Sequence, residues 1–106
     1  MAWMFLLVAG LLEIVWSFTM KLSAGFTRGT PTAVTILAMV ASFALLSIAM
    51  KTLPLGTAYT VWTGIGAVGA FVVGVVALDE PLTLARVLAA ALIVAGMTIM
   101  KLTTSA

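Results

Sequence analysis

The sequence predicts an all-α membrane protein, with four transmembrane helices in a single domain over residues 1–106. Of the 106 residues, 64% are hydrophobic and only 8% are charged, whereas soluble domains carry about a quarter charged residues. The mean hydropathy is +1.33. Prolines and charges divide the chain into four apolar stretches. At a rise of about 1.5 Å per helical residue, each is about long enough to cross a bilayer core.

The first apolar span covers about residues 2–20 and ends at Lys21, which precedes a polar loop containing glycine. A removable signal peptide would carry its positive charge before the apolar run, so we expect this span to be retained. The second span, about residues 31–50, contains no charge. It opens at Thr30 and Pro31, where threonine is expected to cap the helix and proline fits the first helical position.

The third span covers about residues 54–78 and begins at Pro54, after a very short connection. An Asp-Glu-Pro sequence at residues 79–81 then breaks the chain. Thr83 is a candidate N-cap for the fourth span, about residues 84–102, which leads into a polar tail. Short loops join all four spans, so we expect one domain without a linker.

Lysine and arginine are divided almost evenly between the two sides of the predicted bundle. One side holds Lys51 and Lys101, and the other holds Lys21, Arg28 and Arg86. This distribution gives hardly any bias under the positive-inside rule. Either a short chain simply has few charges to count, or the chain inserts in both orientations.

The small size of the chain favours a homodimer. Four helices are barely enough to surround a water-accessible site and shield it from lipid. A homodimer would double both the helices and the intramembrane acids. Two copies inserted in opposite orientations would also form an inverted repeat, a common basis for alternating access.

The composition excludes several classes of protein. Without cysteine or histidine, the chain has no disulfides, no thiolate metal site and no Cys or His nucleophile. The acids are Glu13, Asp79 and Glu80, and the last two are neighbours in a predicted loop, so no converging pair of carboxylates is available for hydrolysis or metal binding. A net charge of +2 without a basic run argues against nucleic-acid binding. We therefore expect that the protein is not an enzyme and that it has no cofactor and no metal site.

Glu13 is the most informative residue. It is the only charge in the first twenty positions and lies roughly two helical turns from Lys21. An unpaired charged carboxylate in a membrane is costly, so such a residue usually faces a cavity or a partner and has a function. On a helix, Trp16 lies three positions away on the same face and supplies an indole N–H.

Three further side chains are candidates for the same site. Tyr59 and Trp62 lie three apart on the third span, and Ser42 lies near the middle of the second. Aromatic faces attract cations, and hydroxyl and indole groups donate hydrogen bonds. A carboxylate ringed by such groups suits a small cation. Two alternatives remain open: Tyr59 would also fit a membrane interface, and Ser42 would also bond to its own helix.

Small residues mark two further helix faces. Gly64 and Gly66 remove bulk at mid-span, where a helix bends more readily, although tight packing alone would also explain them. Gly66 and Ala70 have the small-xxx-small spacing that lets helices approach closely. Ala89 and Gly96 lie seven apart on one face of the fourth span, which suggests contact with a second subunit.

Three segments together make the chain resemble the small multidrug resistance family of proton-coupled exporters over essentially its whole length. They are LEIVW at 12–16 with Met20-Lys21, GFTR at 25–28 before Pro31, and LPLGTAYTVWTGIG at 53–66. The tryptophan within the first segment and the long third segment resemble the guanidinium exporter branch most closely.

The resemblance implies an antiparallel, dual-topology homodimer in the bacterial inner membrane. It implies that Glu13 is the essential carboxylate, that Trp62 and Tyr59 line the pocket, and that Trp16 and Ser42 hydrogen-bond to the glutamate. Two glycines and two dimer-contact positions also match the family, with alanine replacing one dimer glycine: Gly64, Gly66, Ala89 and Gly96.

The expected function is therefore antiport, with guanidinium leaving the cell as protons enter. Both ions would compete for a pair of Glu13 carboxylates, one from each subunit. The main alternative is an exporter of quaternary ammonium or other lipophilic cations. A passive channel and a non-transporting subunit are further alternatives; a channel would conduct without a proton gradient, and such a subunit would tolerate Glu13→Ala.

Overall fold

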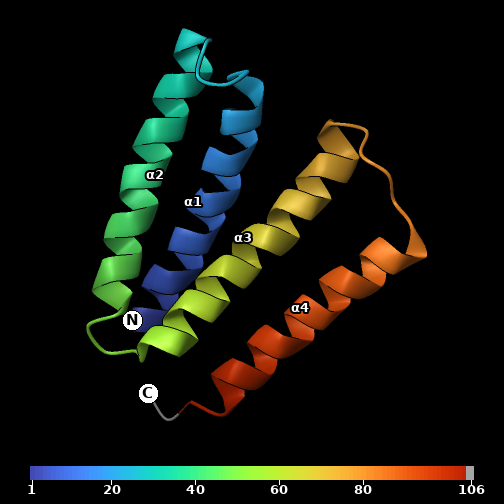
Figure 1. Cartoon of the computed structure of the whole chain (residues 1–106). Helices are drawn as coiled ribbons and strands as arrows, with labels where there is room; N and C mark the ends of the chain where they lie inside the picture. Colours follow the sequence, from blue (N-terminus) through green and yellow to red (C-terminus); the bar gives the residue numbers. More distant parts are fainter. Residues whose placement is uncertain (105–106) are drawn as a thin grey trace.

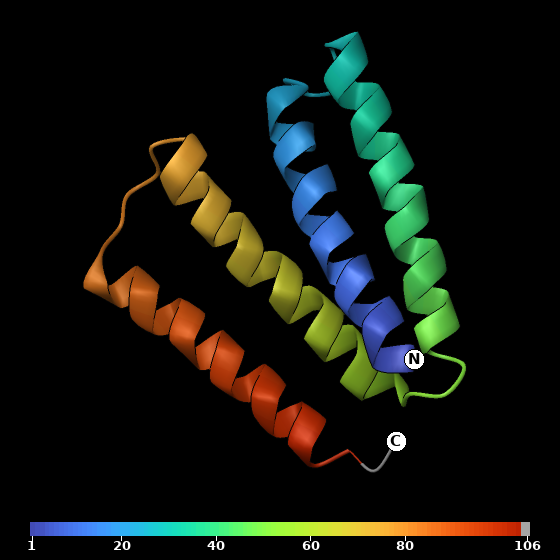
Figure 2. The same cartoon turned by 180° about the vertical axis from the view of Figure 1, so that it is seen from behind.

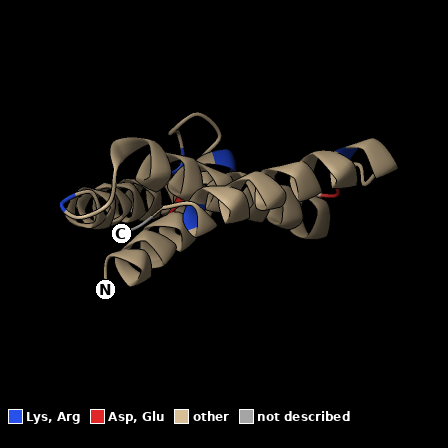
Figure 3. Ribbon diagram, turned by 90° about the horizontal axis from the view of Figure 1, so that it is seen from below, with Lys and Arg blue, Asp and Glu red and all other residues tan. Residues whose placement is uncertain are grey.

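The computed structural model describes residues 1–104, which form four helices joined by short loops (Figure 1). They are α1 (Ala2–Leu22), α2 (Gly29–Ala49), α3 (Leu55–Ala77) and α4 (Leu84–Leu102). All four are long and apolar enough to cross a membrane. Most of the ribbon carries no charged residue (Figure 3). The chain is thus a multi-pass, all-helical membrane protein.

Two predicted helix starts can be compared with the observed ones. The α4 start is confirmed, because the Thr83 hydroxyl accepts the backbone N–H of Arg86 at 3.2 Å. The predicted cap at Thr30 is wrong, because α2 begins earlier, at Gly29. Pro31 is tolerated at the third helical position because the first four N–H groups of a helix have no partner within it.

The helices alternate in direction, and their packing is unequal. α1 packs against both α2 and α3, whereas α4 packs mainly against α3 (Figures 1 and 2). α4 also reaches α1 at one point, where Nζ of Lys101 lies 5.1 Å from the centre of the Trp3 ring. The polar contacts between α1 and α2 include the hydroxyls of Thr19 and Thr35, which lie 2.6 Å apart. The start of α1 and the end of α4 lie at the same end of the molecule (Figure 1).

The buried core lies at that same end, among the first half of α1, the second half of α2 and the first half of α3. Its members are Leu6, Ala9, Leu46, Ala49, Leu53, Ala58, Val61 and Trp62. No residue of α4 is buried. The described chain measures 43 × 34 × 16 Å, and a helix with its side chains is about 10–12 Å across. One chain is therefore a slab about one to two helices thick.

Candidate functional site

Glu13 lies near the middle of α1, and its side chain points at the backbone of α3. A β-carbon added at Gly66 would overlap the Glu13 carboxylate. Only a residue without a side chain leaves room for the acid at this point. The glycine therefore has a specific role in the α1–α3 contact: it seats the carboxylate against the neighbouring helix.

Two more glycines let α1 and α3 approach on either side of that acid. A β-carbon at Gly10 would overlap Ile65, and one at Gly69 would overlap Ile14. Gly64 plays the same part towards α4, where an added β-carbon would overlap Met97. The predicted close packing of the glycine-rich third span is present. α3 itself runs unbroken from Leu55 to Ala77.

Two polar side-chain atoms of α1, from residues one helical turn apart, are buried without a hydrogen-bond partner in the described part of the chain. They are Oε1 of Glu13 and Nε1 of Trp16. A buried polar group without a partner typically costs about 1–3 kcal/mol. Both atoms therefore have unused bonding capacity, which a bound ligand or a rearranged side chain would satisfy.

Ser42 connects three helices at this level. Its hydroxyl donates to the Ala9 carbonyl of α1 at 2.6 Å and accepts the indole N–H of Trp62 from α3 at 3.0 Å. Neither expected alternative occurs here: the serine bonds neither to Glu13 nor to its own helix. The hydroxyl instead holds Trp62 in place, anchored to the α1 backbone one turn before Glu13.

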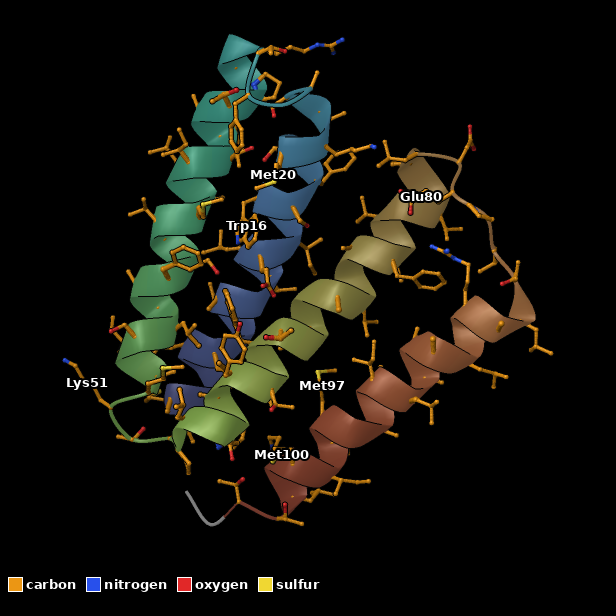
Figure 4. The ribbon with its side chains drawn as sticks, viewed as in Figure 1. Trp16, Met20, Lys51, Glu80, Met97 and Met100 are labelled. Carbon is orange, nitrogen blue, oxygen red and sulfur yellow. The ribbon has the colours of Figure 1, made fainter. Side chains whose placement is uncertain are left out.

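Four aromatic rings form a row across α1, α2 and α3. Trp16 meets Phe43 edge to face with centroids 6.3 Å apart, and Phe43 meets Trp62 in the same way at 5.8 Å. Tyr59 extends the row, with its ring 5.6 Å from that of Trp62. Phe43 was not predicted from the sequence, where its only signal is its place beside Ser42 in the charge-free span. Trp16 is labelled in Figure 4.

Cavities flank α3 on both sides. One, of about 340 Å³, lies between α1 and α3 and includes Ser17 and Ala67, which are close along the chain to Glu13 and Gly66. Another, of about 430 Å³, lies between α3 and α4 and is lined by Tyr59 among others. Tyr59 therefore borders open volume directly, and the other cavity comes within one helical turn of Glu13 along α1.

The two predicted dimer-contact residues lie on the exposed helix α4. Ala89 and Gly96 are both exposed, and an added β-carbon at Gly96 would meet nothing within 4 Å. Their role in subunit contact stays a prediction. Among residues 1–104, no group of three or more acids, histidines or cysteines is placed to hold a metal ion.

Comparison with known proteins gives a consistent result. The family model for the Small Multidrug Resistance protein matches residues 1–104. Guanidinium exporters of Citrobacter freundii and Salmonella typhimurium are each 57% identical over 104 residues, covering 98% of this chain and 99% of theirs. The guanidinium exporter of Yersinia pseudotuberculosis serotype I is 55% identical over 102 residues, covering 96% of this chain and 98% of its own.

Proposed function

Because this chain belongs to the Small Multidrug Resistance protein family, we propose that it exports guanidinium across the bacterial inner membrane in exchange for protons. The names of its relatives support a small organic cation as the substrate. The single observation that carries the proposal is the Glu13 carboxylate, buried against Gly66 with one oxygen unpaired.

The chemistry of this site suits guanidinium. The ion is planar and presents N–H donors in a fork that matches the two oxygens of a carboxylate. Its flat face also suits aromatic rings. Glu13 supplies the carboxylate, and Trp62, held by Ser42, supplies a ring in a fixed orientation. Trp16 contributes an unused N–H donor that would orient the acid once the cation is bound.

Proton coupling follows from competition for a single group. A carboxylate that holds a proton has no charge for a cation, and one that holds a cation resists protonation. If Glu13 is exposed first to one aqueous side and then to the other, each turnover trades protons for guanidinium. No second ionisable residue in the membrane is needed for this exchange.

We further propose that two chains, inserted in opposite orientations, form the working unit. A slab 16 Å thick, with an outer helix that buries no residue, has little means of shielding an acid from lipid. A second copy would cover that surface and bring a second Glu13. Inward-open and outward-open states would then be equivalent by symmetry, and an exchange of conformations between the two subunits would give alternating access.

The direct test uses purified protein in proteoliposomes. An inward proton gradient should drive guanidinium transport. Glu13→Gln should abolish this transport, because the amide carries no negative charge and no titratable proton. Asp79→Asn removes a carboxylate from the exposed loop and is the matched control, with transport retained. Robust exchange by Glu13→Gln would end the proposal.

A quaternary ammonium exporter would use the same acid, so a separate competition experiment is needed to identify the substrate. Tetramethylammonium carries one positive charge but has no N–H donor for the unpaired Glu13 oxygen. Guanidinium should therefore compete strongly for transport, and tetramethylammonium only weakly. The reverse order would favour the quaternary ammonium function.

A further inference from the structure

A second carboxylate, Glu80, is held against the end of α3 by the turn that follows this helix. Asp79 adopts a left-handed conformation with φ of 56°, which aspartate tolerates better than most residues. The turn brings the Glu80 N–H back to the Gly74 carbonyl, at 3.1 Å. A β-carbon at Gly74 would overlap the Glu80 carboxylate, so the glycine leaves room for it. Figure 4 labels this acid.

The guanidinium group of Arg86 lies beside this carboxylate. Its Nη2 atom is 4.0 Å from Oε1 of Glu80, and its central carbon lies 5.6 Å from the centre of the Phe71 ring. The Thr83 cap fixes the backbone of this first turn of α4. The chain thus places a guanidinium group of its own between an acid and an aromatic ring.

This arrangement lies at the mouth of the cavity between α1 and α3. The cavity of about 340 Å³ is lined by Glu80, Phe71 and Arg86, and also by Ser17, Lys21 and Ala67. Ser17 lies one helical turn after Glu13, and Ala67 follows the glycine that seats the Glu13 carboxylate. The same open volume therefore extends from the loop to Ser17, one helical turn from Glu13 along α1.

We propose that Glu80 and Phe71 form an outer subsite for guanidinium, which the free ion enters by displacing the side chain of Arg86. The inference rests on the proposed function and adds to it a second place where the substrate binds. The Arg86 side chain ends in the same functional group as the substrate, so groups that bind one can bind the other.

The exposure of the pair suits such an exchange. The side chains of Arg86 and Glu80 are 46% and 41% exposed, and ion pairs this exposed are weak. A free ion in solution can therefore replace the arginine readily. Substrate bound there would be concentrated at the mouth of the cavity that leads towards Glu13.

The alternative is that the ion pair only stabilises the α3–α4 loop. The two explanations predict different signs for the changes in KM that Glu80→Gln and Arg86→Gln cause. If the pair only stabilises the loop, Glu80→Gln and Arg86→Gln break the same ion pair and change the KM for guanidinium in the same direction. If Glu80 holds substrate and Arg86 competes with it, the two substitutions change the KM for guanidinium in opposite directions.

The experiment measures initial transport rates of full-length protein in proteoliposomes over a range of guanidinium chloride concentrations. Glu80→Gln should raise KM roughly threefold, the size that an exposed ion pair supports. Arg86→Gln should lower KM by a similar factor. Phe71→Leu, which changes no charge, should raise KM about twofold through loss of the cation–π contact.

Asp79→Asn is the matched control, because it removes the neighbouring negative charge, which is exposed and does not line the cavity. Its KM should equal that of the wild type. A shift equal to that of Glu80→Gln would reduce the effect to general electrostatics and overturn the subsite. Shifts of the same sign in Glu80→Gln and Arg86→Gln, or an unchanged KM in both, would also overturn it.

The two proposals fail in different ways. If wild-type protein moves no guanidinium, the proposed function fails and the subsite fails with it. Suppose instead that the wild type transports guanidinium and Glu13→Gln does not, while Glu80→Gln and Arg86→Gln shift KM in the same direction. Only the outer subsite then fails.

Discussion

The Glu13 carboxylate of α1 occupies the space that a side chain at position 66 of α3 would fill, and Gly66 leaves that space open. The acid and the glycine are therefore complementary in shape, because Gly66 has no side chain in the space that the Glu13 carboxylate occupies. Ser42 and Trp62 are joined by a hydrogen bond within the same three-helix layer. The predictions below follow from these contacts.

Gly66→Ala should destabilise the protein by about 1–3 kcal/mol, because the new methyl group must displace the carboxylate or separate α1 from α3. Guanidinium binding should fall with it. The free energy of unfolding in detergent and the transport rate are the measurements. Gly56→Ala, in the same helix but with open space around it, is the control and should be neutral or slightly stabilising. Equal effects from the two variants would contradict the role of Gly66.

Ser42→Ala should lower the free energy of unfolding by about 0.5–2 kcal/mol, because the Trp62 indole N–H loses its partner and the Ala9 carbonyl loses its hydrogen bond from α2. Released from its anchor, the Trp62 ring should also change its fluorescence. Thr98→Ala is the comparison, since that hydroxyl bonds only within its own exposed helix. It should change stability little. An unaltered Trp62 signal in Ser42→Ala would argue against the anchoring.

Acidification should weaken guanidinium binding. Protons and the cation compete for the Glu13 carboxylate, so each unit of pH below the titration of the site should raise the apparent KM by up to about tenfold per displaced proton. Rates measured with equal pH on both sides of the vesicle separate this competition from the driving force. Asp79→Asn should show the same pH profile as the wild type. A KM that does not change with pH would exclude a shared site.

Gly96→Leu should reduce dimer formation without disturbing the fold of the single chain. A β-carbon at this position meets nothing within 4 Å in one chain, so we expect the cost to come from contact with a partner subunit. Chemical cross-linking in membranes and helix content by circular dichroism are the measurements. Gly56→Leu, also open, is the control. If Gly96→Leu dimerises like the control, the α4 contact surface lies elsewhere.

Several parts of the candidate site were predictable from the sequence because they depend on local properties. An isolated acid in an apolar span indicates function, since its burial is costly wherever the helix packs. The spacing of Tyr59 and Trp62 places them on one helix face, and their rings do lie together. The Thr83 cap was predicted correctly because capping involves only adjacent residues. The Thr30 cap was wrong because α2 begins two residues before Pro31.

The remaining contacts depend on which helices meet, and helical periodicity does not contain that information. The partners of Ser42, the place of Phe43 in the ring row and the return of Glu80 to Gly74 all join segments by tertiary packing. Each glycine could be read from the sequence as small. Only the packing assigned Gly66 to Glu13 and Gly74 to Glu80.

By itself, the sequence determined four apolar helices, their alternating course and one acid within the membrane, because length, hydropathy and charge act locally along the chain. The tertiary structure decided that α1 lies between α2 and α3, that α4 is left on one side, and that the acid rests on a glycine. The physical reason is that close packing selects among many apolar faces of nearly equal hydrophobicity by shape.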